Sequence, residues 1–310
     1  MRHLEAPAQY ALIQSSVAVL GLMVGPSMSF AQTPKPGEVS TAITASVLSQ
    51  LSTDIDKGGR FSWWGAEFSV GVTRQFTTEL SAGVTGKYGA ERWSFETPTA
   101  FGTAAPWDSI NRPSVGLSLA YQISGDLALF VVPQVEWAYE SGASASDAIN
   151  YGAVIGLTKV YSPQLVVGVG VGAFRQIDRN FYFPFVIVNW QITDSLRLSN
   201  PLQAGPTGGA GLELSYSWSD SWEAAAGAAF REYRFRLRAD GSTPNGLGQN
   251  EGVPLFARLT RKFGPVAQVD LYAGAVIGGK LKLINAAGGT VQSSRYGAAP
   301  LLALSGTINF

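Results

Sequence analysis

Residues 296–310 read YGAAPLLALSGTINF, and large apolar side chains recur at alternate positions of this stretch. One face carries Tyr296, Ala298, Pro300, Leu302, Leu304, Gly306, Ile308 and Phe310. The other face is small and polar and includes Ser305 and Thr307. Because successive side chains of a strand point to opposite faces, one face suits lipid and the other suits water. A terminal Phe310 on the apolar face is typical of an outer-membrane β-barrel, since aromatic rings favour the interface between hydrocarbon and headgroups.

The first residues have the layout of an export signal. A short basic region precedes an apolar run at 17–24 that is too short to cross a bilayer as a helix. Ser29 and Ala31 then place small residues at the spacing that signal peptidase accepts. We expect a signal peptide at 1–31, a short N-terminal segment at 32–40 and an outer-membrane β-barrel at 41–310.

Composition argues against several function classes. The 22 basic and 22 acidic side chains cancel, so nothing in the charge balance indicates nucleic-acid binding. His3 is the only histidine, there is no cysteine, and His3 would leave with the signal peptide. We therefore expect no enzyme, no cofactor and no His or Cys metal site. Asp54 and Asp56 could serve only as weak calcium ligands, and solvated loop charges explain them more simply.

Alternation between apolar and small or polar residues recurs along the whole chain, and each barrel strand is a weak signal alone. Between several of these stretches lie short turns rich in Ser, Asp, Gly and Pro, at 124–126, 162–164, 193–195, 219–221 and 264–266. Longer polar connections lie at 96–111, 141–147 and 240–251. Short turns on one side and long loops on the other are typical of an outer-membrane barrel, with the short turns facing the periplasm.

The pattern predicts an all-β fold, namely a transmembrane antiparallel up-and-down barrel of 14 strands, with 12 strands as the alternative. The expected strands are 41–52, 60–73, 78–93, 112–123, 126–140, 150–161, 164–178, 181–193, 196–201, 207–218, 222–238, 251–263, 267–283 and 297–310. The segment 196–201 is short for a membrane strand. Residues 41–52 fit a strand or a small amphipathic helix equally well, so the sequence leaves that choice open.

Aromatic residues gather near the ends of the expected strands. On the side of the short turns we place Phe76, Tyr121, Tyr161, Trp190, Trp218, Trp222, Phe263 and Phe310. Toward the opposite rim we place Trp63, Trp64, Trp93, Phe95 and Trp107. Such girdles mark both membrane interfaces of a barrel. A soluble β-sandwich core is the alternative, but it explains neither the terminal Phe310 nor the clustering beside turns.

Polar residues on the faces opposite the apolar stripes are the candidate pore lining. They are Glu67, Gln134, Glu136, Asn189, Gln191, Arg197, Glu213, Arg258, Lys262 and Asp270. A charge facing lipid at the bilayer midplane would cost about 2–4 kcal/mol for Arg or Lys, so we expect these side chains to point inward. They either bias the charge of a passing solute or form a salt-bridged interior that rigidifies the wall.

Glycines at 168, 170 and 172 alternate with valines, which forbids the helix that a nucleotide-binding loop would need. We interpret them as small positions that face the lumen. The glycines around Pro206 lack the Lys and Ser or Thr of a phosphate-binding loop, and we interpret that segment as an extracellular loop.

Three segments carry a resemblance to known proteins: 184–191 (PFVIVNWQ), Leu198 and 211–216 (GLELSY). They resemble a family of uncharacterised Gram-negative outer-membrane barrels grouped with the porin-like proteins. The resemblance implies a porin-like barrel and no known substrate or functional residue.

The leading functional hypothesis is a passive, porin-like channel for small hydrophilic solutes in the outer membrane. The alternative is a non-conducting structural or surface-interaction barrel whose extracellular loops bind a ligand. Expected partners are outer-membrane lipids, lipopolysaccharide and the barrel-assembly machinery, and the sequence does not indicate an oligomeric state. The assembly signal would be Leu302, Leu304, Ile308 and Phe310.

Overall fold

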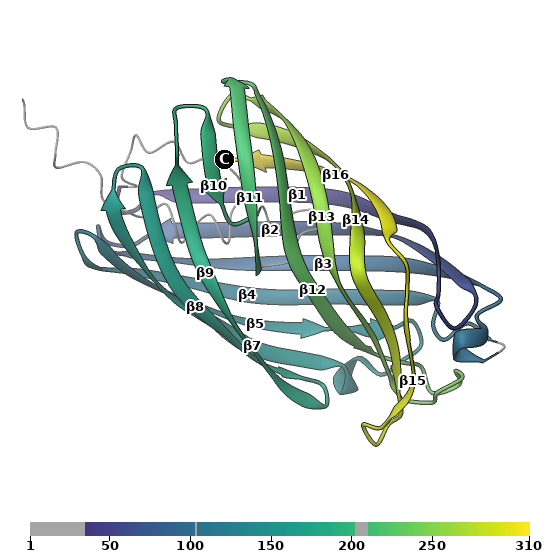
Figure 1. The fold of residues 1–310 in the computed structure, drawn as a ribbon. Coiled ribbons are helices and arrows are strands. Elements are labelled where there is room, and N and C mark those ends of the chain that lie inside the picture. Colours follow the sequence, from purple (N-terminus) through teal and green to yellow (C-terminus); the bar gives the residue numbers. More distant parts are fainter. Residues whose placement is uncertain (1–34, 103, 202–209) are drawn as a thin grey trace, which may run out of the picture.

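A computed structural model describes residues 35–102, 104–201 and 210–310 and shows a closed antiparallel barrel of 14 strands (Figure 1). Two of the strand segments, β6 and β15, are short outer continuations of β5 and β16. The prediction of 14 strands is therefore confirmed. Residues 41–52 lie within a strand rather than a helix. Among the described residues, no helix is long and apolar enough to cross a membrane.

The strands follow one another around the wall. Their bounds are β1 Val39–Asp54, β2 Arg60–Gln75, β3 Leu80–Glu96, β4 Ser109–Ser124, β5 Leu127–Trp137, β6 Tyr139–Glu140, β7 Ile149–Ser162, β8 Leu165–Gln176, β9 Arg179–Gln191, β10 Leu196–Ser199, β11 Ala210–Ser219, β12 Trp222–Arg236, β13 Leu247–Phe263, β14 Ala267–Ile284, β15 Thr290–Arg295 and β16 Ala299–Asn309. Two short 3₁₀ helices, η1 Thr99–Phe101 and η2 Ala145–Asp147, lie in the long loops.

The barrel closes between its first and last strands. β1 pairs with β16 from Ala42 opposite Asn309 to Gln50 opposite Leu301. β11 also pairs with β12, so the sheet is continuous around the wall at the end that carries the short turns. Closure leaves no open sheet edge at this end, as a membrane-embedded sheet requires.

The two faces of the strands separate as the sequence predicts. On β16, Leu302 and Leu304 are exposed on the outside, whereas Ser305 and Thr307 are buried inside. The prediction that Tyr296 lies on the lipid face is wrong, because its side chain is buried inside the barrel. The cause is a break between β15 and β16, where residues 296–298 interrupt the ladder and reverse the alternation.

The aromatic girdle is present at the end with the short turns but differs at the outer rim. Tyr161, Trp218 and Phe263 are exposed beside the turns, in the positions predicted. Trp63, Trp93 and Trp107 lie at the outer rim but point inward and are buried. The predicted position of these three residues along the barrel axis, near the outer rim, is correct. The prediction that they belong to a lipid-facing girdle is wrong. Trp64 does face outward there.

The glycines of β8 leave the space that aromatic rings of β9 occupy inside the barrel. A Cβ at Gly170 would overlap the ring of Phe185, and a Cβ at Gly172 would overlap the ring of Phe183. Phe183 also stacks on Phe174 with 6.1 Å between ring centroids. These glycines are therefore small inward positions, as predicted, and they allow the rings of β9 to lie flat against β8.

We predict that Gly172→Val destabilises the folded barrel by about 1–3 kcal/mol, because the new side chain overpacks the ring of Phe183. Urea unfolding of the refolded protein, followed by tryptophan fluorescence, measures this change. Gly86→Val is the matched control, since a Cβ at Gly86 meets nothing within 4 Å. Equal unfolding midpoints for the two variants would show that the space at Gly172 does not contribute to the stability of the barrel.

Candidate functional site

Strand β12 leaves the barrel wall halfway along its length. It lies beside β11 as far as Phe230, which is opposite Ala210. Farther out it meets β6 in a parallel bridge between Arg236 and Tyr139. Because β7, β8, β9, β10 and β11 lie between β6 and β12 around the wall, this bridge crosses the barrel. We call the place where β12 separates from β11 the fork.

The space enclosed beyond the fork is filled with apolar side chains. The outer core consists of Ile55, Phe61, Trp63, Trp93, Ala100, Phe101, Trp107, Ile110, Ala138, Tyr233, Phe235, Leu237, Val276, Leu281, Leu283, Tyr296, Ala299 and Leu301, all of them buried. Trp107 is 1% exposed and packs edge-on against Trp93 and Phe235, with centroids 5.6 and 5.2 Å apart. A close-packed apolar core leaves no space for water, so the barrel axis is blocked at its outer end.

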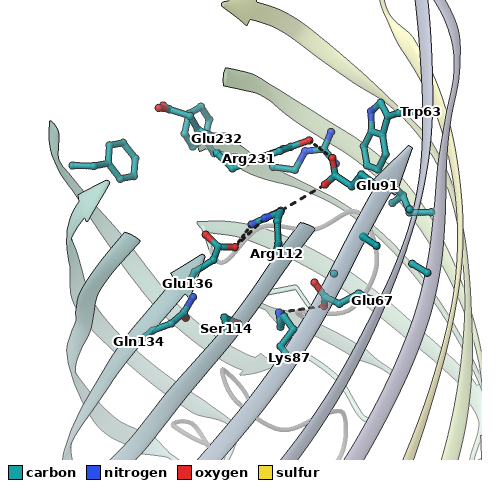
Figure 2. Close-up of a pocket in the computed structure, with 18 of the residues that line it drawn as sticks. Trp63, Glu67, Lys87, Glu91, Arg112, Ser114, Gln134, Glu136, Arg231 and Glu232 are labelled. Carbon is teal, nitrogen blue, oxygen red and sulfur yellow. Dashed lines mark hydrogen bonds and ion pairs between the residues drawn. The ribbon is translucent and has the colours of Figure 1, made fainter. Parts of the chain in front are cut away.

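A chamber of about 320 Å³ lies at the fork, below the outer core (Figure 2). Arg112 extends into it from β4 and holds two carboxylates. Its guanidinium donates to Glu136 Oε1 at 2.7 and 2.9 Å, and its Nη1 lies 3.7 Å from Glu91 Oε1. Glu91 Oε2 also accepts hydrogen bonds from Trp93 Nε1 at 3.0 Å and Tyr233 Oη at 2.9 Å. This ion-paired cluster ties β3, β4, β5 and β12 together beneath the outer core.

Aromatic rings form the opposite side of the same chamber. Phe181 and Phe183 point inward from β9, and their centroids are 5.5 Å apart. Phe230 lies across from them on β12 and is 44% exposed. The chamber is therefore amphipathic, with ion pairs on one side and phenyl rings on the other.

Arg231 differs from the other cations of the chamber. Among the described residues its guanidinium makes no ion pair and no hydrogen bond, and its Nη2 is buried without a partner. The guanidinium lies over the ring of Trp63, with Cζ 5.2 Å from the centroid. Lys87, by contrast, forms an ion pair, with its Nζ 3.2 Å from Glu67 Oε1.

Two ion pairs join the tip of the β8–β9 hairpin to the outward face of β12. Arg179 pairs with Glu232, and Arg234 Nη1 donates to both carboxylate oxygens of Asp178 at 2.7 and 2.9 Å. The Arg234 side chain is only 9% exposed, and its Nε donates to Gln249 at 2.7 Å. We call these two pairs the latch, because they lie over the side of the chamber that the outer core leaves unfilled.

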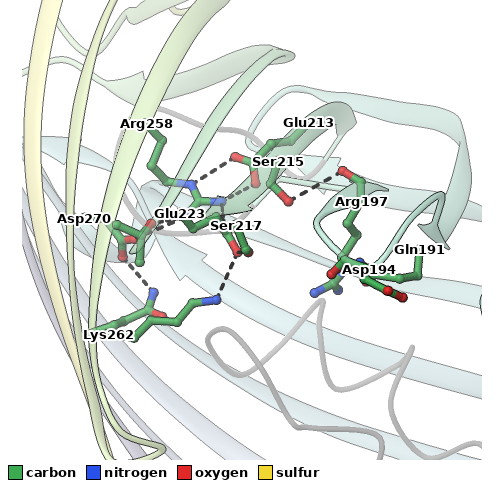
Figure 3. A network of polar contacts seen from close by, with 12 residues as sticks. Gln191, Asp194, Arg197, Glu213, Ser215, Ser217, Glu223, Arg258, Lys262 and Asp270 are labelled. Atoms are coloured by element: carbon green, nitrogen blue, oxygen red, sulfur yellow. Dashed lines mark hydrogen bonds and ion pairs between the residues drawn. The ribbon is translucent and has the colours of Figure 1, made fainter. Parts of the chain in front are cut away.

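The lower lumen contains a second polar network (Figure 3). Arg258 Nη2 lies 2.5 Å from Glu213 and 2.8 Å from Glu223, and its Nη1 lies 3.4 Å from Asp270. Lys262 Nζ also reaches Glu223 at 3.0 Å. This network links the inner faces of β11, β12, β13 and β14. Such a dense set of ion pairs supports the interpretation of these charges as wall-stiffening contacts.

The predicted pore-lining residues therefore separate into two groups. Glu67, Gln134 and Glu136 line the chamber, whereas Glu213, Arg258, Lys262 and Asp270 form the lower network. Asn189 accepts from Arg197 Nε at 2.8 Å, and Gln191 donates to the carbonyl of Thr193 at 2.7 Å in a turn. All these side chains point inward, but their role in conduction stays a prediction.

Sequence reasoning missed several residues of the chamber. Lys87, Glu91, Arg112 and Arg231 were not among the predicted lining residues, although all four line the chamber. Lys87 and Glu91 could have been found, because they alternate with the lipid-facing Val84 and Tyr88 on the same strand. Arg231 could not, because its environment depends on the fork.

Glu140 ties together the long loops above the outer core. Its carboxylate accepts the backbone N–H groups of Asp108 at 3.2 Å and Arg238 at 3.0 Å. The Arg238 guanidinium in turn donates to Asp108 Oδ2 at 3.3 Å. Burial raises the pKa of the Glu140 carboxyl, and the two N–H donors and the charge of Arg238 oppose that rise.

We predict that Glu140→Ala speeds amide hydrogen exchange in the loop residues 97–102, 104–108 and 237–246 by about tenfold or more. The substitution removes the acceptor of two partly buried N–H groups, and each one that stays unsatisfied costs about 1–3 kcal/mol. Exchange measured by mass spectrometry tests this. Asp240→Ala is the control, because Asp240 also pairs with Arg238 but is 88% exposed. Equal exchange in both variants would contradict the assigned role.

No known protein family matches the sequence, and no curated protein matches it. Several solved outer-membrane barrels are similar in structure. An outer-membrane channel from Pseudomonas putida F1 has a TM-score of 0.49 at 10% identity, over 89% of this chain and 96% of that one. The toluene transporter TodX of Pseudomonas putida has a TM-score of 0.44 and 11% sequence identity, and the match covers 96% of each chain. The KdgM porin has a TM-score of 0.37 and 9% sequence identity, and the match covers 86% of this chain and 99% of that one.

Likeness at this level concerns the barrel architecture and carries no neighbour's substrate over to this chain. The predicted resemblance to an uncharacterised porin-like family stays a prediction, because no family is identified.

Proposed function

We propose that the protein is an outer-membrane channel for small solutes in which the route bends at the fork. The observation that supports this is the chamber itself, an amphipathic space of about 320 Å³ located where the outer core blocks the barrel axis. A general porin keeps a straight aqueous channel, and this barrel does not. Export to the outer membrane is part of the proposal and rests on the lipid-facing belt and the expected signal peptide.

The proposed route begins in the lower lumen, where small polar side chains such as Ser81, Thr307 and Ser305 line the wall. It enters the chamber beneath the outer core and leaves between β12 and the β8–β9 hairpin. The latch closes this exit, so passage requires the ion pairs of Asp178 and Arg179 to separate. The channel is accordingly expected to pass small solutes at low conductance and to open intermittently.

A non-conducting structural barrel is the second candidate, and the filled outer end favours it. In that case the chamber is an enclosed space and the latch is a permanent tie between β12 and the hairpin. We further propose that outer-membrane lipids and lipopolysaccharide cover the outer belt. The barrel-assembly machinery would read the exposed face of β16, at Leu302, Leu304, Ile308 and Phe310.

Planar-bilayer recordings of the refolded protein separate the two candidates. We predict small, brief openings for the wild type. The double variant Arg179→Ala/Arg234→Ala removes both latch pairs and is expected to raise the open probability severalfold. Arg175→Ala is the control, because Arg175 lies on the same hairpin but is exposed on the outside and makes no ion pair among the described residues.

The recordings have two outcomes that decide the matter. Current in the wild type that increases in the latch variant but not in the control supports the bent route. Silence of all three proteins, each folded by heat-modifiability, would show that the barrel is structural.

A further inference from the structure

We propose that the chamber at the fork binds small organic carboxylates that carry one ring or a short branched body. Arg231 would hold the carboxylate, and the phenyl rings of β9 would cover the apolar part. This inference rests on the proposed function, since it names the class of solute that the channel would take. It draws on three observations about the chamber: its unpaired charge, its aromatic wall and its size.

The charges of the chamber select an anion. Every chamber carboxylate already has a cationic partner among the described residues: Glu67 with Lys87, Glu91 and Glu136 with Arg112, and Glu232 with Arg179. Arg231 has none. These four carboxylates share three cations, because Arg112 pairs with both Glu91 and Glu136. Among the described residues, Arg231 is therefore the one cation of the chamber that has no carboxylate partner and can offer its donors to an anionic solute.

The surroundings of Arg231 favour a carboxylate over other acceptors. A guanidinium presents parallel N–H donors that match the two oxygens of a carboxylate, and such charge-assisted bonds are stronger than neutral ones. Its Nη2 is buried and without a partner, which is costly unless an acceptor is present. The Arg231 Cζ lies 5.2 Å from the centroid of the Trp63 ring, and this ring face supplies no oxygen that could accept a hydrogen bond.

The opposite wall selects an apolar body. Phe181 and Phe183 point into the chamber and are only partly buried, so these rings have surface available to a ligand. Phe183 is fixed between Phe174 and Phe185, with centroids 6.1 and 5.9 Å away. A ring held in this way can stack on an aromatic ligand with little loss of side-chain freedom. Inorganic anions would gain nothing from this wall.

The volume limits the size of the ligand. About 320 Å³ is at the low end of the range of roughly 300–1,000 Å³ that ligand pockets span, so a long acyl chain would not fit inside.

A second cation, Arg197, lies nearer to the short turns than the chamber does. It bonds to Asn189 and makes no ion pair among the described residues, so it offers an anion a second position along the lumen.

Binding to the full-length protein refolded in detergent micelles tests the inference, with benzoate as the probe. Isothermal titration measures the affinity. Intrinsic tryptophan fluorescence, to which Trp63 beside Arg231 contributes, offers a second signal. Benzamide and benzylamine have the same ring but are neutral and cationic, and empty micelles correct for partitioning. We expect benzoate to bind at least tenfold more tightly than either analogue.

Variants assign the two parts of the site. Arg231→Gln is expected to weaken benzoate at least tenfold and to leave benzamide unchanged, and Arg231→Lys to restore part of the loss. Phe183→Leu should weaken benzoate and benzamide alike. Arg175→Ala, on the outside of the same hairpin as Phe183, should change neither. Heat-modifiability confirms that each variant is folded.

Two results would overturn the inference: equal affinity for benzoate and benzamide, or unchanged benzoate affinity in both Arg231 variants. Failure of the proposed function is a separate outcome. Benzoate binding without any current in bilayers would leave the site in place and reject the channel. Current without benzoate binding would reject the site alone.

Discussion

The pairing of β12 with β6 across the barrel is the contact on which the remaining features depend. Near the short turns all 14 strands form one cylinder around a polar lumen. Beyond Phe230, β12 crosses to Tyr139, and the strands on its far side no longer enclose the same space. One chain thus forms a wide lower barrel and a narrower outer one. The change in diameter decides where water and where apolar side chains are found.

The outer core and the chamber both follow from this narrowing. A narrow barrel can be filled by its own inward side chains, and here tryptophan and phenylalanine rings fill it. At the fork the wall is interrupted, so rings from β9 meet charged groups from β4 and β12 instead of a neighbouring strand. The contrast between Phe183 and Arg112 on opposite sides of one small space is the chemical property that distinguishes this barrel from a plain aqueous pore.

The alternation of side chains was enough to predict the strands, the lipid face and the inward direction of residues such as Glu136 and Arg258. It could not predict which inward residues meet, because register alone does not place β12 beside β6, a strand of two residues. Trp63, Trp93 and Trp107 suit a lipid girdle and a packed core equally well by composition. Their direction depends on the narrowing of the barrel, which is a property of distant pairings. Tyr296 was misplaced because a break in the ladder leaves no clear mark in the pattern.

Disulfide cross-linking of Tyr139→Cys with Arg236→Cys tests the crossing of β12 most directly, and the absence of native cysteine makes it clean. The pair Ser215→Cys with Ala225→Cys, at opposed positions of β11 and β12 in the lower wall, is the control. We predict that both pairs cross-link in isolated outer membranes under mild oxidation. Cross-linking of the control pair alone would show that β12 stays in the wall and that the outer barrel is open.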